Sequence, residues 1–125
     1  MSTVYDAGVL IAADRNDRRV WADHRVRLEA GTVPITSAPV IAQASRSPRQ
    51  TQLRRFLRGC EVVAFTAEQS HAVGALLAKT RTADVVDAHV VVVAATTGSA
   101  VVTSDPEDLE ALALHARPRA NVVSV

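Results

Sequence analysis

The sequence predicts a three-layer α/β fold, in which a parallel sheet of about five strands is flanked by helices. Short apolar runs alternate with longer helical patterns from one end of the chain to the other. The 125 residues include 20 Val and 22 Ala but only 3% aromatic residues, a composition typical of a buried sheet packed between helices. No linker, low-complexity tract or internal repeat divides the chain. We therefore expect a single domain that spans residues 1–125.

The expected strands are short runs rich in β-branched residues, too short to form stable helices. They lie at Thr3–Tyr5, Val33–Thr36, Val62–Phe65, Ala100–Thr103 and Val122–Val125. Because they read as continuously apolar, we expect them to be buried on both faces, as in a parallel sheet.

The expected helices lie between these strands and have recognisable ends. They span 7–13, 17–30, 39–45, 48–58, 67–79, 84–97 and 106–116. Pro48 and Pro106 suit first helical turns, and Gly98 stands where a residue with positive φ ends a helix. These signals support an alternation of strands and helices along the whole chain.

Charge and cysteine content exclude several classes of protein. The net charge of +1 excludes a uniformly basic nucleic-acid binder. The single Cys60 cannot form an internal disulfide, and no basic and then apolar leader opens the chain, so we expect a cytoplasmic protein. The most apolar window, residues 85–95, contains Asp87 and His89 and is too short to span a membrane, so no membrane association is expected.

Acidic residues follow two of the expected strands. Asp6 comes directly after the first strand, and Asp105 comes two residues after the end of the fourth. In a parallel α/β sheet the functional crevice lies beyond the carboxyl ends of the strands. If these two strands are neighbours, the two carboxylates converge there.

A third acidic contribution comes from the helix that precedes the fourth strand. Asp84 and Asp87 are three residues apart and therefore share a face of this helix. Asp87 stands among valines, where a carboxylate is costly unless it is exposed or paired. It therefore has the weakest purely structural explanation of these acids.

Carboxylates that are brought together repel one another unless a cation neutralises them. Oxygen ligands without Cys or His at zinc-like spacing favour the hard ions Mg²⁺ and Mn²⁺. Such an ion lowers the pKa of a bound water and neutralises charge on phosphate oxygens. The pattern therefore indicates metal-dependent phosphate chemistry without a protein nucleophile.

Four motifs, in this order, resemble those of the PIN-domain ribonucleases and, within them, the VapC toxins of bacterial toxin–antitoxin pairs. They are V-Y-D-A-G-V-L-I-A at 4–12, A-P-V-I-A-Q-A at 38–44 with Arg46 after it, D-V-V-D-A-H at 84–89 and V-V-T-S-D-P-E-D-L at 101–109. The resemblance covers nearly the whole chain. Any one motif is weakly specific, whereas the four together are fairly specific.

The resemblance implies a PIN-like fold and a Mg²⁺- or Mn²⁺-dependent endoribonuclease with an RNA substrate. It implies Asp6, Asp87 and Asp105 as catalytic metal ligands, with the polar Thr103 or Ser104 beside them. It further implies inhibition by a cognate VapB-like antitoxin, and a homodimer.

One position departs from the family pattern. Gln43 stands where most members carry a glutamate, in the helix after the second strand. An amide still offers a carbonyl oxygen but lacks the negative charge, so we expect Gln43 to assist catalysis with weaker metal binding. Asp84 and Asp108 are near enough in sequence to support the site. The alternative is a catalytically weakened PIN-like module that acts through binding to an antitoxin or to RNA.

Simpler explanations exist for several of these residues. Asp6, Asp84 and Asp105 are each placed to cap a helix, which is compatible with metal binding. Arg46 and Arg49 open a basic run without acids, which fits either RNA phosphates or an ordinary solvated surface. A phosphoryl-transfer domain of receiver or haloacid-dehalogenase type fits the fold pattern, but the second acid of a D-x-D motif is missing after Asp6.

Overall fold

Five parallel strands form one sheet in the order β3-β2-β1-β4-β5 in the computed structural model, which describes residues 2–125. The strands are β1 (Thr3–Tyr5), β2 (Ile35–Ser37), β3 (Glu61–Val63), β4 (Ala100–Thr103) and β5 (Asn121–Ser124). The helices are α1 (Ala7–Asp14), α2 (Arg18–Glu29), α3 (Ala38–Ala44), α4 (Thr51–Leu57), α5 (Ala67–Thr80), α6 (Val85–Thr97) and α7 (Pro106–His115). The predicted α/β class with a five-stranded parallel sheet is confirmed.

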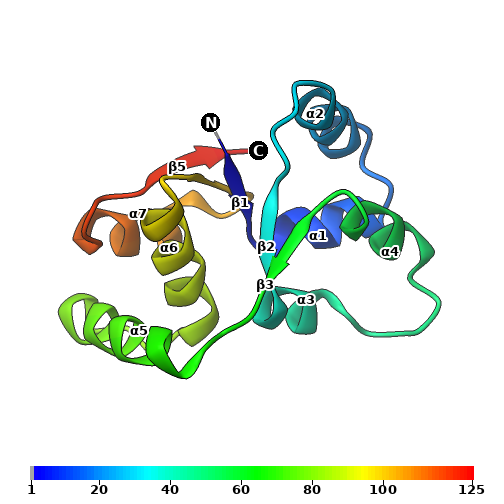
Figure 1. Cartoon of the computed structure of the whole chain (residues 1–125). Coiled ribbons are helices and arrows are strands. Elements are labelled where there is room, and N and C mark those ends of the chain that lie inside the picture. The colour runs from blue at the N-terminus through cyan, green and yellow to red at the C-terminus, as the bar shows by residue number, and fades with distance from the viewer. Residues whose placement is uncertain (1) are drawn as a thin grey trace.

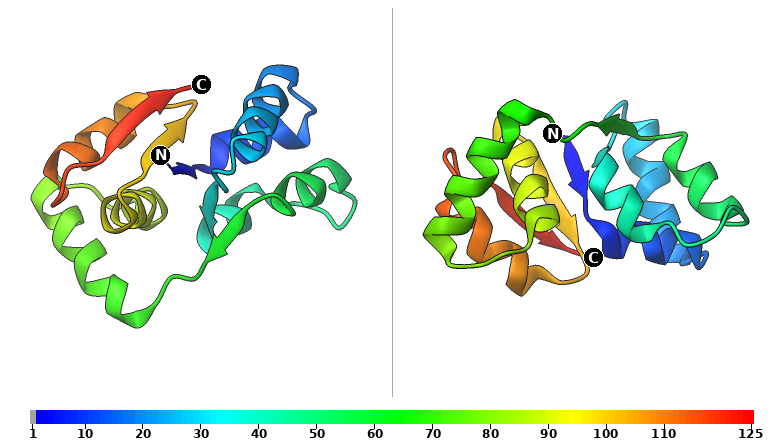
Figure 2. Two further views of the ribbon diagram at one scale, coloured as in Figure 1. Left: turned by 45° about the horizontal axis from the view of Figure 1, so that its top comes forward. Right: turned by 90° about the horizontal axis from the view of Figure 1, so that it is seen from below.

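The helices lie on both sides of the sheet (Figures 1 and 2). Helices α1 to α4 gather on one side and α5 to α7 on the other. The most buried of them is α6, in which every residue from Ala88 to Ala95 is buried. This explains its sequence, because a helix that is apolar all round must be covered all round.

The first and fourth strands are neighbours at the centre of the sheet. Strand β1 pairs with β4 in a register that places Tyr5 opposite Val102. Val4, Tyr5 and Val101 are completely buried. The central pairing places the residues that follow β1 and β4 at one edge, as the sequence analysis required.

Three of the strands have bounds that differ from those expected at both ends. The second strand begins at Ile35, after Pro34, which has no N–H to donate to a sheet. The third strand ends at Val63, and Phe65 instead stacks on His89 with ring centroids 4.5 Å apart. The last strand spans Asn121–Ser124, one residue earlier than predicted.

The predicted helix start at Pro48 is wrong, because α4 begins at Thr51. The side chain of Gln50 holds the preceding residues in a loop. Its Oε1 accepts hydrogen bonds from the backbone N–H groups of Arg46 (2.6 Å) and Ser47 (3.0 Å). The loop therefore has its own hydrogen bonds and does not join the helix.

The expected helix ends are otherwise close to those observed. Gly98 follows α6 with a φ of 66°, as predicted for a residue that ends a helix in the left-handed region. None of the helices within residues 2–125 combines the length and the apolar character needed to cross a membrane.

Candidate active site

Asp6 and Asp105 lie together beyond the carboxyl ends of β1 and β4. The backbone N–H of Asp6 donates to the carbonyl oxygen of Val102, which extends the pairing of these strands by one residue. Asp6 is only 6% exposed, whereas Asp105 is exposed to solvent. The two residues therefore follow neighbouring strands at one edge of the sheet.

The buried hydroxyl of Thr103 connects these two acids. Its Oγ1 donates to Oδ2 of Asp6 and accepts a hydrogen bond from the backbone N–H of Asp105 at 2.9 Å. The other carboxylate oxygen of Asp6 accepts from the N–H of Val9 at 3.3 Å, so Asp6 also caps α1. Asp6 can thus cap α1 and still be available as a ligand. The hydrogen bond from Thr103 fixes the orientation of the Asp6 carboxylate.

Ser104 packs closely against the first turn of α1 at Gly8. A Cβ atom added at Gly8 would lie 2.0 Å from Oγ of Ser104 and 3.5 Å from Oδ1 of Asp6. Glycine at position 8 therefore allows the loop after β4 to pack against the first turn of α1, beside Asp6.

Asp87 lies in the first turn of α6, next to the start of α7. Its backbone N–H donates to Oδ1 of Asp84 at 3.0 Å, so Asp84 caps the helix. Asp84, Asp87, Glu107 and Asp108 line one pocket of about 310 Å³ between these two helices. Glu107 was missed in the sequence analysis, because its place beside Asp87 depends on how α6 and α7 pack.

The acids influence one another strongly. The pKa of Asp87 is raised to about 6 by burial and by the negative charges of Asp84, Asp6 and Asp108. Burial raises the pKa of Asp6, and the charge of Asp105 adds to this, while hydrogen bonds from Thr103 and the backbone oppose it.

The same repulsion extends to the start of α7. The pKa of Asp105 is raised, chiefly by the negative charge of Asp108. Asp6, Asp84, Asp87, Asp105 and Asp108 therefore form one electrostatically coupled group, which we call the acidic site.

The donor set of the acidic site fits a hard cation. All its donors are carboxylate oxygens, and raised pKa values mean that a nearby positive charge would be favourable. Within residues 2–125, no three His, Cys, Asp or Glu side chains are already arranged to hold a metal ion. Asp6, Asp87 and Asp105 therefore do not form a preassembled three-ligand site.

Gln43 lies in a different pocket from Asp87. It is exposed on α3 and lines a cleft with Asp14, the last residue of α1, with Arg15, which follows it, and with Arg46. None of the hydrogen bonds among the described residues connects Gln43 to Asp6, Asp87 or Asp105. The structure thus brings the three aspartates together electrostatically and places Gln43 beside arginines.

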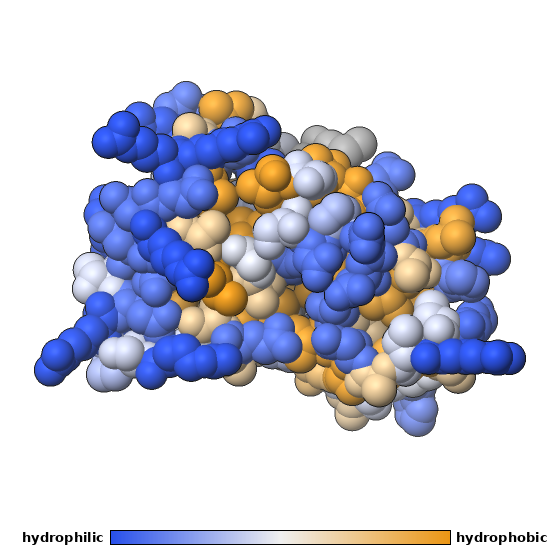
Figure 3. All heavy atoms as spheres, turned by 180° about the vertical axis from the view of Figure 1, so that it is seen from behind, coloured by the Kyte–Doolittle hydropathy of each residue, from blue (hydrophilic) through white to orange (hydrophobic). Residues whose placement is uncertain are grey.

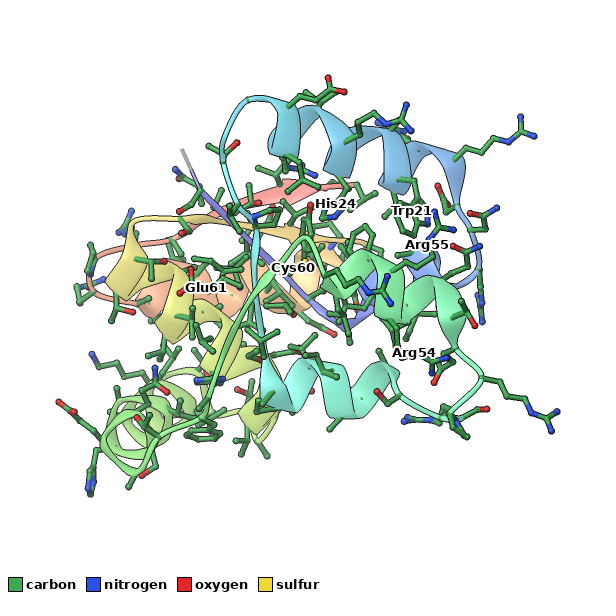
Figure 4. All side chains as sticks on the ribbon, turned by 45° about the vertical axis from the view of Figure 1, so that its right-hand side comes forward. Trp21, His24, Arg54, Arg55, Cys60 and Glu61 are labelled. Atoms are coloured by element: carbon green, nitrogen blue, oxygen red, sulfur yellow. The ribbon has the colours of Figure 1, made fainter. Side chains whose placement is uncertain are left out.

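The arginine-rich side of the molecule carries α2 and α4. Arg46 and Arg49 are exposed in the loop before α4, and strongly hydrophilic side chains cover this side, on the left in Figure 3. Arg55 of α4 lies over the ring of Trp21 of α2, with its guanidinium carbon 5.7 Å from the ring centroid (Figure 4). This surface is well placed to attract a polyanion.

Comparison with solved structures finds the same fold. The crystal structure of VapBC2 from Rickettsia felis, bound to a DNA fragment from their promoter, matches with a TM-score of 0.74 and 16% identity over 100% of this chain and 99% of that chain. The crystal structure of PAE2754 from Pyrobaculum aerophilum matches with a TM-score of 0.66 and 18% identity over 100% and 92%. At these identities the likeness establishes the fold.

Comparison of sequences gives the family. No curated protein matches the sequence. The family model of the PIN domain matches residues 3–114, which include β1 to β4, the acidic site and nearly all of α7. The chain therefore belongs to the PIN domain family.

Proposed function

We propose that this protein is a Mg²⁺-dependent endoribonuclease, with Mn²⁺ as a possible substitute, that hydrolyses RNA phosphodiester bonds with an activated water molecule. The observation that carries the proposal is that Asp6 and Asp105 follow the paired strands β1 and β4 and are joined through Thr103, with Asp87 of α6 near enough for the charge of Asp6 to raise its pKa. Membership of the PIN domain family supports it, because PIN domains are generally nucleases.

In this proposal Asp6, Asp87 and Asp105 hold the ion. When bound, Mg²⁺ would lower the pKa of a coordinated water and neutralise charge on the phosphate oxygens. Thr103 holds the Asp6 carboxylate in place through its hydroxyl. Asp84 fixes the first turn of α6 and thereby the position of Asp87.

Other residues would support the three metal ligands or contact the RNA. Asp108 adds negative charge beside Asp87 and Asp105, which favours a cation at this edge of the sheet. Ser104 packs against Gly8 and keeps the loop after β4 close to Asp6. Arg46 and Arg49, both exposed, would contact the RNA backbone.

The test is cleavage of structured RNAs by the purified protein with Mg²⁺ or Mn²⁺. We expect products with a 5′-phosphate and a 3′-hydroxyl, and no cleavage in EDTA. Asp87→Asn should lower the rate about 100-fold or more, because a metal ion contributes several kcal/mol to transition-state stabilisation. Asp23→Asn, the same change on the exposed face of α2, is the matched control. Cleavage that survives both EDTA and Asp87→Asn would contradict the mechanism.

A second candidate function is a catalytically weakened PIN-like module that acts through an antitoxin or RNA. Two points favour it: Gln43 stands where the family resemblance implies a glutamate, and no three ligands are preassembled within the described residues. Gln43→Glu distinguishes the two candidates. If this substitution creates nuclease activity that the wild type lacks, the weakened module is correct. If the wild type cleaves equally fast, the module is excluded.

We also propose that the protein is the toxin of a VapBC-type pair in the cytoplasm, inhibited by a VapB-like antitoxin and assembled as a homodimer. The fold similarity to VapBC2 from Rickettsia felis supports this proposal. Co-expression with the product of a neighbouring gene should give a stable complex without nuclease activity. Light scattering of the purified protein should give twice the mass of 13.3 kDa. A monomer at all concentrations would contradict the dimer.

A further inference from the structure

The cleft that contains Gln43 lies between α1 and α3, outside the acidic site, and has a volume of about 360 Å³. We call it the α1–α3 cleft. Its polar lining residues are Asp14, Arg15, Gln43, Arg46, Ser47 and Gln50. Gln43, which stands where the family resemblance implies a glutamate, thus lies beside two arginines.

Gln50 gives this cleft a defined shape. Its Nε2 donates to Oδ2 of Asp14 at 3.1 Å and to the carbonyl oxygen of Ala44 at 2.9 Å. Its Oε1 accepts from the N–H groups of Arg46 and Ser47. The Gln50 side chain therefore connects the loop after α3 to the end of α1. It also donates a hydrogen bond to the carboxylate of Asp14, the one carboxylate that lines the cleft.

The remaining polar groups of the cleft favour an anion. One guanidinium nitrogen of Arg46 donates to the carbonyl oxygens of Ala42 (3.2 Å) and Ser45 (2.7 Å), which fixes this side chain. A guanidinium has five N–H donors, so others remain for a ligand. The two positive charges of Arg15 and Arg46 exceed the one negative charge of Asp14, so the lining of the cleft is net positive. Gln43 contributes an amide and no charge. Arginine pairs well with phosphate oxygens.

The cleft is placed to contact a nucleic-acid strand that reaches the acidic site. Asp6 caps the beginning of α1 and Arg15 follows its end, nine residues later. At 1.5 Å per residue this separation is about 13 Å along the helix. A phosphate in the cleft would therefore belong to a nucleotide outside the reacting bond.

We propose that the α1–α3 cleft binds a phosphodiester group of the RNA substrate away from the cleaved bond, with Arg15, Arg46 and Gln43 as donors. The inference rests on the proposed function, because it takes RNA as the substrate. It gives Gln43 a specific purpose: a glutamate at this position would repel the phosphate that the two arginines attract.

The test measures binding of a fluorescein-labelled single-stranded RNA by anisotropy, in EDTA so that no cleavage occurs. Gln43→Glu and Arg46→Ala should each weaken binding about 5-fold or more at low salt. Arg46→Ala should also reduce the slope of log K against log salt concentration by about 0.7, the value for one lost phosphate contact on a single strand. Gln43→Ala, which adds no charge, should weaken binding less than Gln43→Glu.

The control is Arg119→Ala, which removes an exposed arginine in front of β5, remote from the cleft. Because Gln43 is exposed, Gln43→Glu should fold normally, and circular dichroism checks this for every variant. Unchanged RNA affinity in Gln43→Glu would overturn the inference, and so would an equal loss in Arg119→Ala.

Failure of this inference differs from failure of the proposed function. If the variants bind RNA as the wild type does while Mg²⁺-dependent cleavage is normal, the cleft proposal is wrong and the nuclease stands. If binding depends on Gln43 and Arg46 as expected but no RNA is cleaved with Mg²⁺ or Mn²⁺, the nuclease is wrong and the cleft proposal stands.

Discussion

Thr103→Val tests whether one buried hydroxyl maintains the acidic site. Thr103 is completely buried, and its Oγ1 donates to Asp6 while accepting from the backbone N–H of Asp105. Valine has nearly the same shape, so the change removes the hydroxyl without opening a cavity. The carboxylate of Asp6 loses a donor, and the N–H of Asp105 loses its acceptor.

The expected cost follows from these two interactions. A hydrogen bond to a charged group contributes about 1.5–3 kcal/mol to stability. We therefore expect the free energy of unfolding at pH 7 to fall by about 2 kcal/mol. Because the hydroxyl of Thr103 holds the pKa of Asp6 down against burial, that pKa should rise further in the variant.

The pH dependence identifies the charged partner. The hydrogen bond favours ionised Asp6, so its stabilising effect is present above the pKa of Asp6 in the folded protein and fades as the pH falls through it. Urea unfolding of wild type and Thr103→Val between pH 7 and pH 4 measures this difference. The gap in stability between the two proteins should narrow towards low pH.

Thr36→Val is the matched control. Thr36 is also fully buried, in β2 on the other side of β1, and its hydroxyl donates to the neutral carbonyl oxygen of Tyr5 at 3.3 Å. Its loss should cost about 1 kcal/mol without pH dependence. If Thr103→Val is as stable as the wild type, or if its cost is as independent of pH as that of Thr36→Val, the role assigned to Thr103 is wrong.

Three further predictions concern other contacts of the fold and the site. Gly8→Ala should cost about 1 kcal/mol, because its methyl group would displace Oγ of Ser104 and still lie close to Cβ of Ser104; the Gly8→Ala/Ser104→Gly double variant should recover most of this in urea unfolding. The carboxylate of Asp87 should titrate near pH 6 in carbon NMR spectra, and added Mg²⁺ should move the midpoint down; an unmoved midpoint would contradict a shared ion. Burial lowers the pKa of His24 below its ordinary 6.5, so stability should fall as the pH drops below about 6.5; His24→Gln should flatten that decline, and an equal decline would exclude His24 as its cause.

The sequence predicts the central part of the site because general rules apply there. Short apolar runs of β-branched residues predict β1 and β4, and the rule for parallel sheets predicts that Asp6 and Asp105 follow them at one edge. The run of valines around Asp87 predicts a buried helix. These inferences depend only on patterns that are local in the sequence.

What the sequence does not predict depends on side chains that meet across the fold. The late start of α4 results from hydrogen bonds of Gln50, one of which reaches Asp14, 36 residues away. Glu107 joins the pocket of Asp87 only because α6 and α7 begin next to each other. The position of Gln43 beside Arg15 depends on the packing of α3 against α1. None of these contacts leaves a local pattern.

The repulsion within the acidic site is partly offset because several of its acids stand at the beginnings of helices. Asp6 caps α1, Asp84 caps α6 and Asp105 precedes the first residue of α7. The positive end of a helix dipole stabilises a nearby negative charge by about 0.3–1 kcal/mol. Three such ends converge on one group of carboxylates and offset part of their repulsion.

Asp87, inside the first turn of α6 and not at its cap, has the raised pKa of about 6. A bound cation would therefore stabilise the ionised form of Asp87 in particular. The pKa of Asp87 is thus the quantity most sensitive to metal binding.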